Sequence, residues 1–167
     1  MSMKTIQVGN ATPLQLDWLV ARCKGYREIR IFPPHRPTDR GWIEVRFNPE
    51  PKATTARFDP SDNWFLGGPI LDRMMRNGLR LGGFKCGYPS DPTSCFANLD
   101  GKFAMGGSSA LIAGLRCYVA SEMGETVEVP NVLWSEPKGE GSRVEESGNV
   151  VSVAHQDGTV ATGLISG

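Results

Sequence analysis

The chain has 167 residues, 40% of them hydrophobic, and its 18 basic and 18 acidic residues balance to a net charge of zero. This length fits one domain with a hydrophobic core and room for a tail. Proteins that bind duplex DNA along its backbone usually carry an excess of basic residues. The balanced charge therefore disfavours this class of protein, although a local basic patch is still compatible with it. No apolar run approaches the roughly 20 residues that span a bilayer, so we expect no membrane partner.

The N-terminus has no signal-peptide core, and the four cysteines include no Cys-x-x-Cys pair. We therefore expect a cytoplasmic protein with reduced thiols. Cys23 and Cys117 stand within helical apolar patterns and are expected to be small core residues.

Alternating apolar and polar residues predict short strands along much of the chain. The expected strands are residues 4–9, 26–32, 41–47, 53–58, 79–86, 93–99, 102–105 and 126–129. Loop 33–40, rich in proline and polar residues, predicts an extended hairpin tip that could form a lid. Asp100-Gly101 is a short-hairpin signal. Together these features favour a mostly antiparallel sheet.

Helical spacing of apolar residues predicts three helices, over 13–24, 69–77 and 108–123. Thr12, Pro13 and Gln15 form a capping-box start for the first. Ser108 or Ser109 caps the last. The predicted fold class is therefore α+β, in which a small antiparallel sheet packs against two main helices and one short helix.

The C-terminal part differs in composition from the rest. Residues 1–134 form the predicted domain, and 135–147 are rich in Gly, Glu and Ser, which is typical of a linker. Residues 148–167 predict a C-terminal β-hairpin around Asp157-Gly158. A lone hairpin is marginal in water, so this one docks on the domain, pairs with another subunit or stays unfolded.

Two junctions between glycines and helices point to an anionic ligand, because backbone N–H groups at helix starts favour anions. An adjacent tryptophan can stack on a base. The candidate ligand-binding residues are Ser61, Asn63, Trp64, Gly67, Gly68, Gly107, Ser108, Ser109 and Arg116. The alternative interpretation is structural: a tight turn, Trp64 in the core, serines as helix caps and Arg116 in an exposed salt bridge.

Other polar residues are weaker candidates. Asp59, Asp62 and Asp72 could hold a metal, but turn and capping roles account for them. His35 and His155 have no nearby ligands at zinc spacing, and no Ser–His–Asp set can be argued. We therefore predict no catalytic residue, no metal and no cofactor.

A basic, aromatic hairpin could bind a nucleotide or close over a pocket, and the alternative is an ordinary solvated surface. Its residues are Tyr26, Arg27, Arg30, His35, Arg36, Arg40 and Trp42.

Three blocks of the sequence match the pattern of a known family. Residues 16–25 (LDWLVARCKG) match an LDWAVA…G opening, and residues 61–70 (SDNWFLGGPI) match an S-x-D-W-x-x-G-G-P-I core; with these blocks the chain resembles the NinX-like family of small phage accessory proteins. Residues 110–130 resemble its closing helix and strand. Asn63 stands where the family favours aspartate, Gly107-Ser108-Ser109 where it favours Gly-Pro-Thr-Pro, and the part after Trp134 has no counterpart.

The resemblance, over roughly residues 10–133, implies a tailed-phage protein in the host bacterial cytoplasm and supplies no catalytic residues. The expected function is non-enzymatic: a homo-oligomer that sequesters a nucleotide immune signal of the cyclic dinucleotide or cyclic ADP-ribose type. One alternative is a protein-interaction module that inhibits a host factor or aids phage recombination. The other is a metal-dependent nucleotide hydrolase using the aspartates.

Overall fold

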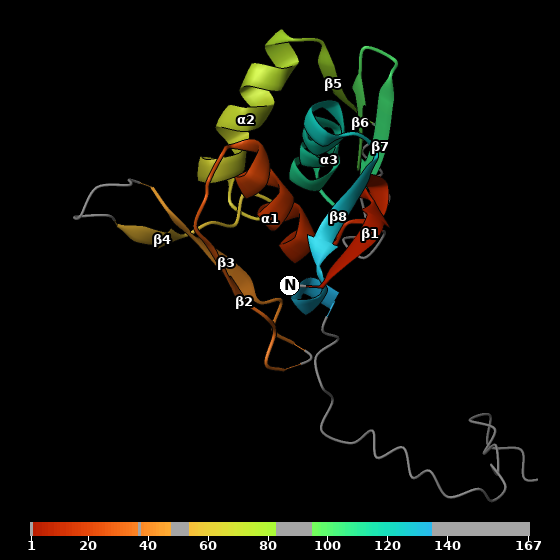
Figure 1. Cartoon of the computed structure of the whole chain (residues 1–167). Helices are drawn as coiled ribbons and strands as arrows, with labels where there is room; N and C mark the ends of the chain where they lie inside the picture. The colour runs from red at the N-terminus through yellow and green to blue at the C-terminus, as the bar shows by residue number, and fades with distance from the viewer. Residues whose placement is uncertain (1, 37, 48–53, 83–94, 135–167) are drawn as a thin grey trace, which may run out of the picture.

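The computed structural model describes residues 2–36, 38–47, 54–82 and 95–134, which form three α-helices and three small antiparallel sheets (Figure 1). The α+β class is therefore confirmed. The linker and the C-terminal hairpin expected over 135–167 lie outside the described residues, as do Cys86 and His155.

The three helices lie close to the positions that the sequence predicted, except that one of them begins earlier. They are α1 (Pro13–Cys23), α2 (Trp64–Arg76) and α3 (Ala110–Met123), with short 3-10 helices at Val8–Asn10 and Asn131–Trp134. The capping box of α1 is present: Gln15 N–H donates to Thr12 Oγ1 (3.4 Å), and Thr12 N–H donates to Gln15 Oε1 (2.9 Å). Ser109 caps α3.

The strands form three sheets where the sequence predicted one. They are β1 (Met3–Gln7) with β8 (Thr126–Pro130); β2 (Ile29–Phe32), β3 (Trp42–Arg46) and β4 (Thr55–Arg57); and β5 (Leu79–Gly82), β6 (Cys95–Leu99) and β7 (Phe103–Gly107). Two of the three predicted hairpins, β2–β3 and β6–β7, are confirmed. Alternation identifies a strand but not its partner, which explains the error in the number of sheets.

Helix α3 lies at the centre of the molecule. It packs against α1, α2 and the β5–β6–β7 sheet, while α1 also packs against β3 (Figure 1). Residues on nearly every side of α3 are buried, as expected for a helix enclosed by other elements. Cys117 of α3 is fully buried, which confirms its predicted core role, and burial raises the pKa of its thiol to about 11.

Helix α2 begins five residues earlier than predicted. The sequence placed its start at Pro69, because proline favours the first helical position. The structure places Trp64 there, with the Asn63 side chain accepting a hydrogen bond from Phe65 N–H (3.0 Å). Pro69 is therefore inside the helix.

Helices α2 and α3 approach closely because a glycine of each helix lies against a leucine of the other. A Cβ atom added to Gly67 would lie 2.7 Å from Leu111 Cδ2 and would also meet the carbonyl oxygen of Pro60. A Cβ atom on Gly114 would lie 2.5 Å from Leu71 Cδ2. Distances this short exclude any larger residue without movement of the chain, so both glycines set the α2–α3 spacing.

Candidate functional site

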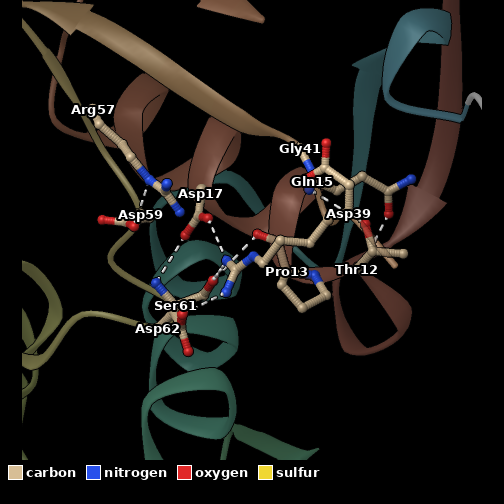
Figure 2. Close-up of polar contacts among 11 residues, drawn as sticks. Thr12, Pro13, Gln15, Asp17, Asp39, Gly41, Arg57, Asp59, Ser61 and Asp62 are labelled. Atoms are coloured by element: carbon tan, nitrogen blue, oxygen red, sulfur yellow. Dashed lines mark hydrogen bonds and ion pairs between the residues drawn. The ribbon is translucent and has the colours of Figure 1, made fainter. Parts of the chain in front are cut away.

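A buried polar network joins α1, the hairpin tip between β2 and β3, and the turn before α2 (Figure 2). Asp17 of α1 is only 1% exposed, and its Oδ1 accepts the Ser61 N–H at 2.8 Å. One Arg40 nitrogen, Nη2, donates to Asp17 Oδ2 (3.0 Å) and Ser61 Oγ (2.9 Å). The other terminal nitrogen pairs with Asp62 Oδ2 at 3.1 Å. Arg40 thus ties three segments together.

The electrostatics of Asp17 are dominated by its burial. Desolvation raises the pKa of Asp17 from 3.8 to about 7, against the opposing effects of the Ser61 hydrogen bonds and the charge of Arg40. Its carboxyl group therefore changes protonation near neutral pH.

Sequence reasoning did not single out Asp17. The signal was available, because Asp17 is an acidic residue beside Leu16 and Leu19 on a helix whose sides are almost all apolar. A charge in such a setting is rarely left without a partner. The partners of Asp17 could not be predicted from the sequence, since Arg40 lies 23 positions later in the chain and Ser61 lies 44 positions later.

Two aromatic side chains project from the first turn of α2 beside this network. Trp64 is 58% exposed and Phe65 is 86% exposed. The alternative that Trp64 anchors the core is therefore wrong. Trp64 and Phe65 are the two most exposed large hydrophobic side chains in the described part of the chain, and they are neighbours at this helix start.

The first glycine junction does not have the geometry that the sequence suggested. Gly67 and Gly68 lie inside α2, and Gly67 N–H donates to the Asn63 carbonyl oxygen at 2.8 Å. The Gly67 N–H is therefore engaged within the helix, and Gly67 itself is a packing residue. Ser61 holds Asp17, and Asn63 caps the helix.

The second junction has a similar structural explanation. Ser109 Oγ accepts the Ile112 N–H (3.2 Å), and its carbonyl oxygen accepts the Ala113 N–H (3.0 Å). Ser108 also has an interaction partner. A Cβ atom on Gly107 would lie 2.6 Å from Ala113 N, so this glycine allows β7 to pass close to α3.

Arg116 does not form the exposed salt bridge expected as its alternative role. Its Nη1 donates to the Gly106 carbonyl oxygen (2.5 Å), and its Nη2 donates to the Ala11 carbonyl oxygen (2.7 Å). Burial lowers the pKa of Arg116. The side chain therefore joins β7 and the segment before α1 to α3.

We expect Arg116→Met to lower the free energy of unfolding by about 2 kcal/mol, because both hydrogen bonds from this cation to backbone oxygens are lost. Urea denaturation would measure the change. Arg76→Met is the matched control: Arg76 pairs with Asp72 on the surface of α2 (2.7 Å), and its loss should cost less than about 0.5 kcal/mol. Equal effects of the two substitutions would contradict the structural role of Arg116.

The remaining polar candidates are engaged in other interactions. Asp59 pairs with Arg57 (2.8 Å), Asp62 pairs with Arg40, and Asp72 pairs with Arg76. His35 donates its backbone N–H to Asp39 Oδ2 (3.4 Å). Within the described part of the chain, no three His, Cys, Asp or Glu residues are grouped to hold a metal.

The basic, aromatic hairpin does not present one face. Tyr26 packs edge-on against Phe58 with ring centroids 5.4 Å apart, and Arg40 points to Asp17. Trp42 stacks on Phe32 at 5.1 Å. Arg27, Arg30 and Arg36 are exposed.

Among the described residues, no helix is both long and apolar enough to cross a membrane. Comparison with curated proteins produced no match. The family model described as "Bacteriophage P22, NinX" matches residues 7–122, and these include Asp17, Arg40, Ser61, Trp64 and Arg116. Because this match covers more than half of the chain, the protein belongs to the bacteriophage P22 NinX family.

Proposed function

We propose that this phage protein binds a phosphate-containing nucleotide signal of bacterial immunity in the host cytoplasm and sequesters it without cleaving it. The proposed ligand is of the cyclic dinucleotide or cyclic ADP-ribose type, and the proposed binding unit is a homo-oligomer. The observation that carries the proposal is the exposed aromatic pair at the start of α2, Trp64 and Phe65.

Aromatic side chains of this kind suit nucleobases, because stacking contributes about 1–3 kcal/mol per base and tolerates any base. The start of α2 also carries the positive end of the helix dipole. Two residues before Trp64, the carboxylate of Asp62 pairs with the guanidinium of Arg40, and this ion pair helps to fix the turn that leads into α2.

The network beneath the aromatic pair supports binding with little reorganisation. Asp17 and Arg40 hold the turn that contains Ser61, and this turn leads directly into α2. A site fixed in advance loses less conformational entropy when its ligand binds. Carboxylates already paired with arginines, as Asp59 and Asp62 are, favour binding over metal-dependent hydrolysis.

We expect Trp64→Ala to weaken nucleotide binding by about tenfold or more, because a stacking surface is lost. Calorimetric titration against a panel of cyclic dinucleotides and cyclic ADP-ribose isomers would measure the change, and native mass spectrometry would give the stoichiometry. Trp134→Ala, which removes another exposed tryptophan, at the end of the 3-10 helix Asn131–Trp134, is the matched control and should leave binding unchanged.

The fate of the ligand separates sequestration from hydrolysis. Ligand recovered intact after heat denaturation of the complex supports sequestration. A cleaved product whose formation stops with a chelator would replace the proposal with the hydrolase alternative. No binding of any nucleotide in the panel would overturn it.

A protein-interaction role is the second candidate, and the 86% exposure of Phe65 favours it. Protein interfaces concentrate their binding energy in such aromatic residues. A Phe65→Ala variant that keeps full nucleotide affinity but no longer inhibits a host factor, measured as phage fitness in a defence-competent host, would support this role.

A further inference from the structure

We infer that the outer face of the β5–β6–β7 sheet is a second ligand site, which takes a nucleoside monophosphate: the base stacks on Phe96 and the phosphate pairs with Arg80. This site shares no residue with the proposed site at Trp64 and does not depend on it.

The strand register defines the outer face. Ala97 of β6 and Met105 of β7 are buried on the inner face, which α3 covers. Side chains alternate between the faces of a strand, so Phe96 and Asn98 of β6 point outward. Arg80 of β5 pairs in register with Asn98 and therefore lies on the same outer face.

Glycines flank Phe96 on both neighbouring strands. Gly82 of β5 and Gly106 of β7 are its partners in register. A Cβ atom on Gly82 would lie 3.4 Å from Phe96 Cε1, so the ring leans over the backbone of β5. Covering a glycine is one reason for an aromatic residue at such a position. Covering a glycine uses only the part of the ring that contacts the backbone. Phe96 remains 45% exposed, so much of its ring is still open to a ligand.

The surroundings of the ring match a nucleotide in size and charge. A cavity of about 550 Å³ is lined by Phe96, Asn98 and Arg80, with Asp100 at the turn. Ligand sites for small molecules have volumes of about 300–1,000 Å³. Arg80 is exposed and forms no ion pair with another described residue, so its guanidinium is available to a phosphate.

Asp100 limits the charge of the ligand. It lies two residues after Asn98, in the β6–β7 turn, which forms one end of the cavity. Its carboxylate lies against Gly78. One nearby cation and one carboxylate suit a single phosphate, because a longer phosphate chain would meet the negative charge of Asp100. The site should therefore prefer adenosine monophosphate to adenosine triphosphate.

The test uses the full chain with adenosine monophosphate, adenosine and inorganic phosphate as probes. Phe96→Leu should weaken binding of adenosine monophosphate about tenfold, because leucine still covers Gly82 but does not stack. Arg80→Gln should weaken the same binding by a similar factor and leave adenosine unaffected. Phe47→Leu is the matched control, since Phe47 is 43% exposed and follows the last residue of β3 in another part of the molecule, and it should have no effect.

Amide chemical shifts locate the site and distinguish it from the one at Trp64. Shifts that are confined to β5 and β6 and persist in Trp64→Ala support the inference whether or not the immune-signal proposal holds. Unchanged affinity in both Phe96→Leu and Arg80→Gln would overturn it, as would shifts only at α2 or tighter binding of the triphosphate. Arg80→Gln alters only an exposed side chain, so it remains decisive if Phe96→Leu fails to fold.

Discussion

Gly67→Ala will lower the free energy of unfolding by about 2–3 kcal/mol, although alanine is the better helix former. The added methyl group meets the Pro60 carbonyl oxygen and lies 2.7 Å from Leu111 Cδ2. Forcing extra volume into a packed core costs about 1–3 kcal/mol or more, which outweighs the roughly 1 kcal/mol that alanine gains in helix propensity. Urea denaturation monitored by circular dichroism would measure the loss.

Gly68→Ala is the matched control for this prediction, because the two glycines are adjacent in the same helix. A Cβ atom on Gly68 would lie 3.3 Å from Trp64 Cε3, and the exposed indole can move aside. We therefore expect Gly68→Ala to be neutral or stabilising by up to about 1 kcal/mol. If both substitutions destabilise equally, the close approach of α2 and α3 does not explain Gly67.

Arg40→Met will destabilise the protein by about 2–4 kcal/mol at pH 8, because it leaves the buried Asp17 carboxylate without its cation. Methionine keeps much of the length of the side chain, so the loss reports mainly on charge. Thermal or chemical denaturation at pH 8 and at pH 5 would measure it.

The effect should shrink at pH 5. Burial raises the pKa of Asp17 to about 7 in the folded protein, against an ordinary value of 3.8. The stability that Asp17 contributes is therefore full below about pH 4 and is lost as the pH rises through about 7. At pH 5 the buried group is mostly protonated, so it needs Arg40 less, and the difference between Arg40→Met and the native chain should narrow.

Arg46→Met provides the control. The side chains of Arg40 and Arg46 are both 33% exposed, but the partner of Arg46 is the exposed Glu28 rather than a buried acid. Exposed pairs contribute only about 0–1 kcal/mol, so Arg46→Met should cost little and depend weakly on pH over this range. A cost for Arg40→Met that is equally small, or equal at pH 5 and pH 8, would contradict the role assigned to Asp17.

Local signals in the sequence predicted many of the elements correctly. The capping box at Thr12, the Ser109 cap and the Asp100-Gly101 turn act over a few residues, and each is present in the structure. The start of α2 was wrong because two local signals competed. Pro69 favoured a start at that position, whereas the Asn63 cap begins the helix earlier.

The candidate site was predictable only in part. Trp64, Asn63 and Ser61 were identified from one stretch, and they do lie together at the start of α2. Which roles they have depends on distant residues. Ser61 holds a buried carboxylate from α1, which periodicity in its own segment could not indicate.

The sequence alone determined the α+β class, the caps at Thr12 and Ser109, the β2–β3 and β6–β7 hairpins and the resemblance to the NinX family, because these depend on short-range chemistry and on ordered motifs. Tertiary structure alone decided that Gly67 is a packing residue, that Arg116 binds backbone carbonyls and that Asp17 meets Arg40. It also decided that Trp64 and Phe65 are exposed. Burial and partner choice depend on how α1, α2 and α3 pack, and the spacing of residues along one segment carries no information about its neighbours in space.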